Sequence, residues 1–221
     1  MAARGRPRIF DRTTVLRKAV EVFWERGYEG TSMKDLTDAM GIASASIYAC
    51  FGSKEALFRE AMVLYTAMEG EVPRMPLRQQ RPTRGAIDAM LRATVDVITL
   101  PGLPQGCMLV LAAPTGSVEN HAIREFLADG RRAQRAEIRD RLARGVADGD
   151  LVASEAQLDA MARYYATIVQ GLSVQARDGA NRQELDAVIN CAMSAWDRLA
   201  SIDGDASQGK HSEVASAGSE S

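Results

Sequence analysis

The sequence predicts an all-α protein in which a small helical domain precedes a larger one, and two observations carry this prediction. Short apolar stripes at helical spacing fill residues 11–65, and each is bounded by a capping residue or a glycine. Longer stripes with the same spacing continue from residue 86 to residue 200. The 221 residues suffice for one small and one medium-sized domain. We therefore expect a first domain at residues 1–53, a second at 54–200 and a disordered tail at 201–221, where apolar periodicity is absent.

Two helices with clear end signals are expected first. The first spans residues 11–27 and ends at Gly27, and the second begins after Ser32, whose hydroxyl can accept from N–H groups of the first turn. Asp35, three residues after Ser32, approximates a capping box. Gly41 ends the second helix, because a left-handed residue costs least when it is a glycine.

A third, very short helix follows the turn. We expect Ser44 to cap it, Gly52 to end it and Ser53 to cap the helix after it. Its apolar face is given by Ile47, Tyr48 and Phe51. A helix this short is stable only when it docks against its neighbours.

The second and third helices with their tight turn form a helix-turn-helix, a motif that places one helix in the DNA major groove. A flexible basic arm precedes it, in which Arg4, Arg6 and Arg8 can follow phosphates or enter a minor groove. The alternative is a helical hairpin that packs only on itself, because this geometry also occurs in proteins that never touch DNA.

Residues 4–65 resemble the DNA-binding domain of the TetR family of bacterial transcriptional repressors. The resemblance rests on GRPR at residues 5–8, on the pattern A..VF...GYEGTS from Ala19 to Ser32, on L...MGI..SIY..F..K..L from Leu36 to Leu57, and on Tyr65. It implies a three-helix DNA-binding domain followed by a helical ligand-binding and dimerisation domain. Residues beyond 70 resemble the family only in length and helical character.

Position in the motif predicts the DNA contacts. Ala45 and Ser46 begin the recognition helix and should meet base edges with Ser44 or Ala49, since alanine can contact a thymine methyl and serine can hydrogen-bond. The resemblance implies that Tyr48 bonds a phosphate, although core packing is the alternative for this ring. The remaining expected contacts are Thr31 or Ser32, Lys34 and Lys54, together with the arginines of the arm.

The distribution of charge agrees with a DNA-binding first domain, although the net charge of −2 does not. Residues 1–60 contain ten basic and eight acidic residues, a sum of +2, which leaves −4 for the rest of the chain. A local basic arm with helix N-termini suffices for a site that touches few phosphates.

No membrane partner is expected, since the sequence has no apolar run near 20 residues, and its basic start is not followed by the hydrophobic core of a signal peptide. Cys50, Cys107 and Cys191 are irregularly spaced and do not form a disulfide framework, which fits a reducing cytoplasm.

In the second domain we expect helices at residues 54–69, 86–100, 106–113, 118–147, 155–177 and 181–200. Residues 70–84, rich in proline, arginine and glutamine, should form a loop. The apolar run GCMLVLAA at 106–113 could be a buried strand, but its all-helical surroundings favour a short helix.

The last two helices carry apolar stripes wide enough for both a domain core and a partner subunit. We expect a homodimer, because two recognition helices must reach successive major grooves. The expected interface residues are Ile168, Leu172, Val188, Ala192 and Trp196. The alternative is that both stripes are buried within one chain.

A regulator also needs a pocket for a small-molecule effector, and flexible methionines suit an adaptable lining. Ordinary core packing is the alternative for these side chains. The candidates are Met62, Met90, Thr94, Cys107, Met108, Leu111, Phe126, Met161, Tyr164 and Tyr165.

Three alternatives to a regulator released by a non-covalent ligand concern a reactive thiol, a loss of DNA binding and an enzyme activity. Some relatives with a Gly-Cys pair at this place sense electrophiles or oxidants through the thiol, and Gly106–Cys107 fits, although a buried inert cysteine is the alternative. A helical ligand-binding protein without DNA binding is a second reading. Enzymes, cofactors and metals are not expected, because GxSxG, HExxH and CxxC motifs are absent and only His121 and His211 are histidines. The expected function is thus a ligand-responsive DNA-binding regulator, a repressor or, depending on operator position, an activator.

Overall fold

The computed structural model describes residues 11–113 and 120–201, and all the regular secondary structure in these ranges is helical, without a β-strand. The elements are α1 (Arg12–Gly30), α2 (Met33–Met40), α3 (Ser44–Phe51), α4 (Lys54–Ala67), η1 (Val72–Arg74), α5 (Met75–Arg78), α6 (Thr83–Ile98), α7 (Met108–Leu111), α8 (His121–Ala147), α9 (Glu155–Arg177), α10 (Arg182–Ser194) and α11 (Trp196–Ser201). The predicted all-α class is confirmed. None of the helices in the described ranges is long and apolar enough to cross a membrane.

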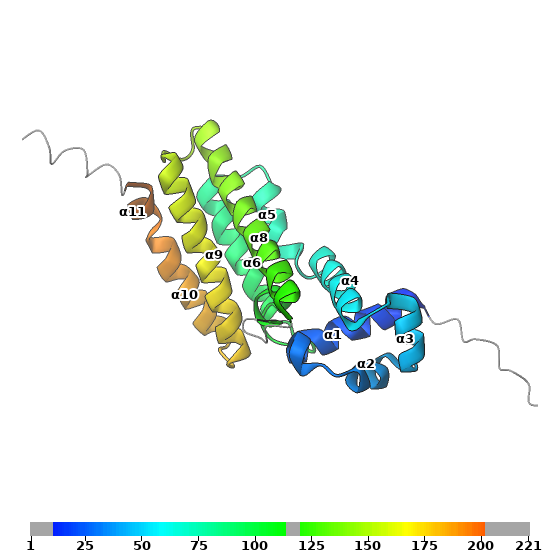
Figure 1. Ribbon diagram of the computed structural model, residues 1–221. Helices are drawn as coiled ribbons and strands as arrows, with labels where there is room; N and C mark the ends of the chain where they lie inside the picture. Colours follow the sequence, from blue (N-terminus) through cyan, green and yellow to red (C-terminus); the bar gives the residue numbers. More distant parts are fainter. Residues whose placement is uncertain (1–10, 114–119, 202–221) are drawn as a thin grey trace, which may run out of the picture.

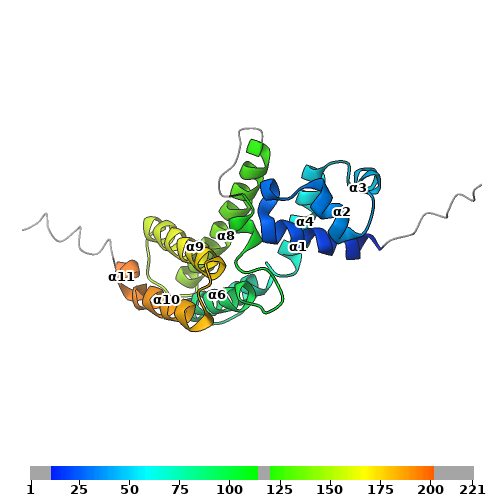
Figure 2. The same cartoon turned by 90° about the horizontal axis from the view of Figure 1, so that it is seen from below.

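The helices form two groups. Figure 1 shows α1–α4 at one end of the molecule and α6, α8, α9 and α10 packed side by side at the other. Figure 2, seen from below, keeps the two groups distinct and shows the start of α8 beside the first group. The arrangement places the helix-turn-helix of α2 and α3 away from the larger bundle.

Caps define the ends of the first helices as predicted, with one exception. Asp11 accepts from the backbone N–H of Thr13 at 3.1 Å and caps α1. Ser32 and Asp35 form the complete predicted capping box of α2. The exception is α3, which begins at Ser44 itself: its N-cap is Ala43, so the expected Ser44 cap is wrong.

Gly27 ends the regular part of α1, with φ of 72° and ψ of 176°. A side chain at Gly27 would place its Cβ 2.7 Å from the carbonyl oxygen of Ala112, so both backbone conformation and space require glycine. The chain then continues to Gly30, and the backbone N–H of Tyr28 donates to the Ala112 carbonyl at 2.8 Å. This turn therefore holds α1 against the segment that contains α7.

Two hydrophobic clusters form the core. The first joins α1–α4 around Phe23, Trp24 and Phe58, and it also includes Met108 of α7 and Ile123 of α8. The second joins α6, α8, α9, α10 and α11 around Tyr165 and other fully buried side chains. Because α7 and the start of α8 pack into the first cluster, the two helical groups share a packed boundary.

Three segments differ from the sequence-based expectation. The loop expected at 70–84 contains η1 and α5. The run at 106–113 is helical, as favoured, but α7 spans only four residues. The last expected helix is divided into α10 and α11 around Ala195. Residues 202–221 and 114–119, with the start expected for α8 and nearly all of the expected tail, lie outside the described residues.

Candidate DNA-contact surface and internal cavity

The outward face of α3 is small and accessible. Ala45 and Ala49 are exposed, Ser44 and Ser46 are half-buried, and Tyr48 is 48% exposed. On the inner face, Ile47 and Phe51 are buried in the first cluster. The exposure of Tyr48 excludes the core-packing alternative, and its hydroxyl lies on the side of α3 that could reach another polymer.

The N-terminus of α3 lacks a side-chain cap, unlike that of α2. The first N–H groups of a helix have no partner within the helix, and they are matched to anions such as phosphate. Ala43 cannot supply that acceptor. The start of α3 is therefore compatible with a phosphate, although this geometry alone identifies no ligand.

The side chain of Thr31 is buried in the turn between α1 and α2. Its side chain is 1% exposed, and its hydroxyl donates to the carbonyl of Gly27 at 2.6 Å, so the expected phosphate contact from this side chain is wrong. The neighbouring Ser32 is exposed, although its hydroxyl already serves the α2 capping box. Ser32 remains a candidate contact, whereas the Thr31 side chain stabilises the turn between α1 and α2.

Two lysines border the motif. Lys34 is exposed and pairs with Asp38 at 2.6 Å, a hydrogen bond that raises its pKa. Lys54 lies half-buried with its ammonium 4.4 Å from the centroid of the Tyr28 ring, and burial lowers its pKa. Both positions border the helix-turn-helix, while Arg4, Arg6 and Arg8 lie outside the described residues.

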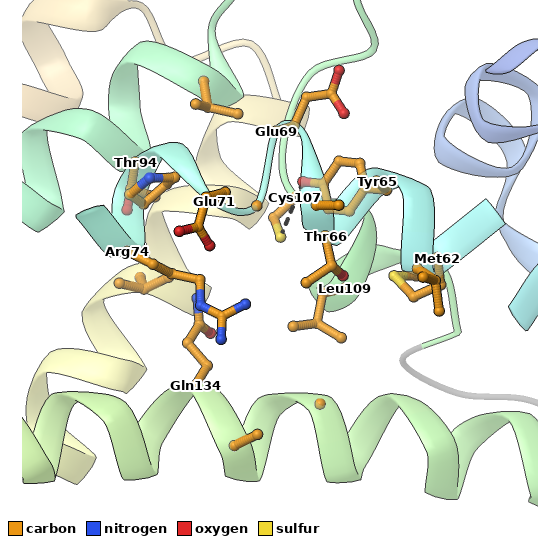
Figure 3. A pocket seen from close by; sticks show the side chains of 18 of the residues that line it. Met62, Tyr65, Thr66, Glu69, Glu71, Arg74, Thr94, Cys107, Leu109 and Gln134 are labelled. Carbon is orange, nitrogen blue, oxygen red and sulfur yellow. Dashed lines mark hydrogen bonds between the residues drawn. The ribbon is translucent and has the colours of Figure 1, made fainter. Parts of the chain in front are cut away.

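An internal cavity of about 560 Å³ lies where α4, η1, α6, α7, α8 and α9 converge. Figure 3 shows it from close by. Its lining is mainly apolar and includes a few polar side chains. The lining residues are Met62, Val63, Tyr65, Thr66, Ala67, Glu69, Gly70, Glu71, Pro73, Arg74, Thr94, Val97, Ile98, Cys107, Leu109, Phe126, Asp129, Gly130, Ala133, Gln134 and Val169.

Four of the ten expected pocket residues line this cavity: Met62, Thr94, Cys107 and Phe126. The other six do not. Four of those six are buried in the hydrophobic core, namely Met90, Met108, Met161 and Tyr165. The remaining two, Leu111 and Tyr164, are half-buried outside the lining.

Sequence reasoning missed the polar part of the lining, above all Tyr65, Arg74 and Gln134. Tyr65 belongs to the motif that carries the family resemblance, which was a usable signal for its importance. Arg74 lies in a segment expected to be a loop, and Gln134 lies in a long charged helix where polar residues normally face solvent. Nothing in the sequence pattern distinguished these two from surface residues.

Cys107 lies at the cavity wall in contact with Tyr65. The Tyr65 hydroxyl donates to the Cys107 sulfur at 3.4 Å (Figure 3), and it accepts from the backbone N–H of Met108 at 3.3 Å. Burial raises the pKa of the Cys107 thiol, which favours the protonated form. Burial likewise raises the pKa of Tyr65 well above its ordinary value, so this hydroxyl stays a donor.

The cavity wall is bonded to α1 through backbone groups. The indole N–H of Trp24 donates to the carbonyl of Gly106 at 2.8 Å, and the Tyr28 N–H donates to the carbonyl of Ala112. From the end of α9, the Arg177 guanidinium donates to the carbonyls of Trp24 at 2.8 Å and Glu25 at 2.9 Å. The helix that precedes the helix-turn-helix is thus held from two sides by the larger bundle.

The expected dimer residues are only partly available at the surface. Leu172, Ala192 and Trp196 are buried within the single chain, so their assignment to an interface is corrected, and Ile168 and Val188 are half-buried. The exposed residues of the same two helices include several with small side chains: Thr167, Gly171, Val174, Ala187 and Cys191. No group of three or more His, Cys, Asp or Glu side chains suited to a metal occurs within residues 11–113 and 120–201.

Comparison with known proteins agrees with this architecture. Residues 15–61 match the family model of the bacterial regulatory proteins of the tetR family. The chain is 29% identical over 198 residues to the HTH-type transcriptional repressor ComR of Escherichia coli K12, covering 89% of this chain and 94% of ComR. It is 28% identical over 195 residues to the uncharacterized HTH-type transcriptional regulator YezE of Bacillus subtilis 168, covering 87% of this chain and 100% of YezE.

A solved structure gives a closer likeness. A cysteine mutant of the TetR family transcriptional regulator CifR, complexed with 26 bp double-strand operator DNA, is 46% identical to this chain. The alignment covers 86% of this chain and 100% of the CifR chain, with a TM-score of 0.83. The likeness therefore extends well beyond the helix-turn-helix into the larger bundle.

Proposed function

This chain belongs to the TetR family of bacterial transcriptional regulators, and we propose that it is a repressor that binds a palindromic operator as a homodimer and is released by a small molecule. Its relatives are DNA-binding regulators rather than enzymes. The observation that carries the proposal is the pairing of an accessible α3 face with a cavity whose wall is bonded to α1.

In the proposed complex, α3 lies in the major groove. Ala45 and Ala49 would contact thymine methyl groups, and Ser44 and Ser46 would hydrogen-bond base edges. Tyr48 would bond a phosphate through its exposed hydroxyl. The phosphate contacts proposed beside it are those of Ser32, Lys34, Lys54 and the arm residues Arg4, Arg6 and Arg8.

The proposed dimer uses the exposed face of α9 and α10. Gly171 has open space around its Cα, which permits close approach of a partner helix. Thr167, Val174, Ala187 and Cys191 complete a face of small side chains on the same two helices. A two-fold dimer would set two α3 helices on half-sites about 34–36 Å apart.

Release by a ligand is proposed to proceed through residues 106–112. This segment contributes Cys107 and Leu109 to the cavity, while its Gly106 and Ala112 carbonyls hold Trp24 and Tyr28 of α1. A ligand that displaces the segment would shift α1 and change the spacing of the two recognition helices. Such a ligand acts only through its different affinity for the two arrangements.

DNA binding is tested by fluorescence anisotropy on a fragment from upstream of the protein's own gene, with random competitor DNA present. We expect specific binding that weakens at higher salt. Tyr48→Phe should weaken it about threefold to tenfold, because one hydrogen bond to a phosphate is lost. Tyr164→Phe, far from α3 in the chain, is the matched control and should leave the affinity unchanged.

Three outcomes would count against parts of the proposal. Binding that any competitor abolishes, on this fragment and on DNA selected from random sequences, would contradict a specific operator binder. Equal affinity of wild type and Tyr48→Phe would remove Tyr48 from the proposed contacts. A monomer mass by light scattering at micromolar concentration would exclude the dimer.

Electrophile sensing by Cys107 is the second candidate function, favoured by the position of its thiol at the cavity wall. The raised pKa of this thiol works against it, since the thiolate is the nucleophile. Cys107→Ser separates the two candidates: loss of the response to a reactive electrophile supports sensing, and an unchanged response leaves non-covalent ligand binding.

A further inference from the structure

The polar groups around the cavity point to the chemical class of its ligand. We propose that the cavity binds an uncharged, mainly apolar molecule that carries a hydroxyl group, and that Gln134 recognises this hydroxyl. The proposal deepens the proposed function and rests on it, because it concerns the effector of the same regulator. Three features of the lining support it: its charges, its unsatisfied amide and its apolar surface.

Every charged residue of the lining is already in an ion pair. Glu69 pairs with Arg17, Arg74 with Glu137, Glu71 with Arg78, and Asp129 with Arg132. The Arg74 pair is bidentate, so the guanidinium charge is directly balanced. A charged ligand would lose its hydration in this cavity without gaining an unpaired counter-charge, which disfavours both anions and cations.

The amide of Gln134 is the second feature that supports the proposal. It rises from α8 into the cavity (Figure 3), and its buried Oε1 atom has no hydrogen-bond partner among residues 11–113 and 120–201. A buried acceptor without a partner is unfavourable, so a ligand O–H that donates to Oε1 removes a deficit present in the empty protein. A hydroxyl both donates and accepts, so it also satisfies the amide if its oxygen and nitrogen exchange places.

The other polar groups of the lining do not oppose this choice. The Tyr65 hydroxyl both donates to Cys107 and accepts from Met108, and the Thr94 hydroxyl donates to the carbonyl of Met90 at 2.9 Å. Glu69 Oε2 is buried without a partner, like Gln134 Oε1, and it too is an acceptor that calls for a donor. Both oxygens therefore call for a ligand that donates a hydrogen bond, and because the Glu69 charge is balanced by Arg17, neither requires a charged ligand.

The rest of the cavity suits an apolar body. Apolar side chains from four helices and α7 line it: Met62, Val97, Ile98, Leu109, Phe126 and Val169. The volume of about 560 Å³ lies within the usual range of small-molecule sites. Burial of hydrocarbon would supply most of the affinity, and the single hydroxyl contact would supply selectivity.

The test uses four probes with one skeleton and different head groups: decanol, decyl methyl ether, decanoate and decylammonium. Affinity is measured by isothermal titration calorimetry on the full-length protein. We expect decanol to bind about fivefold to tenfold more tightly than the ether, which accepts but cannot donate. Both charged probes should bind at least about tenfold more weakly than decanol. The same head groups are also measured on a naphthylmethyl skeleton, in case a linear decyl chain does not fit the shape of the cavity.

Variants of Gln134 test whether this residue sets the preference for decanol over the ether. Gln134→Met should keep the apolar binding but reduce the preference of decanol over the ether to about onefold to twofold. Gln134→Glu adds a negative charge to the lining and should shift the preference towards decylammonium by about tenfold or more. Gln80→Met, between α5 and α6, changes an exposed glutamine outside the lining and is the control, which should behave as wild type.

The outcomes separate this proposal from the broader one. If decanoate or decylammonium binds wild type as tightly as decanol, or if Gln134→Met keeps the full preference for decanol, the assignment of the ligand class is overturned while a ligand-responsive repressor stands. If no probe on either skeleton binds and none releases operator DNA, the cavity is not an effector site and both proposals fail together.

Discussion

The DNA-contact region and the cavity differ in the range of the interactions that build them. In α2 and α3 the decisive groups lie within a few residues of one another, as in the capping box of Ser32 and Asp35. The cavity instead gathers side chains from six elements between residues 62 and 169. A surface built by local signals can therefore be predicted from sequence, whereas a cavity built by distant segments depends on tertiary packing.

The largest effect is expected at Gly27, because this residue belongs to α1 but is constrained by the segment that forms the cavity wall. Gly27→Ala should lower the free energy of unfolding by about 3 kcal/mol or more, since alanine disfavours this conformation and its Cβ would meet the Ala112 carbonyl. Chemical denaturation measures the loss.

Gly41→Ala is the control for that change. Gly41 also has a positive φ, of 69°, but nothing lies within 4 Å of the position that a Cβ atom would take there, so the loss should be about 1 kcal/mol. Equal losses for the two variants would mean that the contact between α1 and the wall adds nothing to the requirement at Gly27.

Arg177 tests the second connection between the regions. Arg177→Met removes two charge-assisted hydrogen bonds to the carbonyls of Trp24 and Glu25, and we expect a loss of about 2 kcal/mol. Lys18→Met, which changes an exposed cation on α1, is the control and should change the stability by less than about 0.5 kcal/mol. Thermal unfolding of both variants would decide, and indistinguishable curves would show that the Arg177 bonds are not stabilising.

Two serines of the helix-turn-helix differ in whether they cap a helix, and their variants should differ in stability. Ser32→Ala removes the cap of α2 and should lower the free energy of unfolding by about 1 kcal/mol. Ser44→Ala, at the start of uncapped α3, should change it by less than about 0.5 kcal/mol. Urea denaturation separates the two values, and a larger loss at Ser44 would contradict the structure of the α3 N-terminus.

The smallest effect expected is a pH dependence from Asp35. Hydrogen bonds from Ser32, followed by the Arg26 guanidinium, lower the pKa of Asp35 from its ordinary value of 3.8 to about 2. Because the folded-state pKa is depressed, the contribution is present above about pH 4 and is lost as pH falls towards 2. Asp35→Asn should therefore flatten the fall in melting temperature over that window.

Asp38→Asn is the comparison for this titration, since Asp38 is exposed and lies on the same helix without a role in the cap. It should retain the wild-type acid dependence. If both variants titrate alike, the acid sensitivity arises elsewhere in the chain.

Much of the fold was predictable because the signals are local. The caps at Ser32 and Ser53, the left-handed Gly41 and the bounds of α9 agree with the sequence-based expectation. The cap of α3 lies one position before the predicted Ser44, because the chain enters α3 at Ala43 and a serine inside the first turn has no capping geometry. The prediction for Thr31 is wrong for a tertiary reason, since its hydroxyl turns inward to the Gly27 carbonyl.

The cavity was predictable only in part. Methionine and aromatic residues were sensible candidates, but Met90, Met161 and Tyr165 fill the core, and apolar pattern alone does not separate core from cavity wall. Gln134 shows the limit most clearly. Its place in α8 resembles that of many solvated residues, and only the tertiary arrangement of α4, η1 and α8 around the cavity makes its amide part of the lining.

The bonds that join the cavity wall to α1 have a consequence for evolution. Trp24 and Tyr28 both donate to main-chain carbonyls, of Gly106 and Ala112, rather than to side chains of that segment. Mutations at Leu109 or elsewhere on the wall can therefore alter which molecule fits while every acceptor of the joint stays in place. If the cavity binds the effector as proposed, lineages that share these two bonds can exchange one effector for another while the hydrogen bonds to α1 are kept.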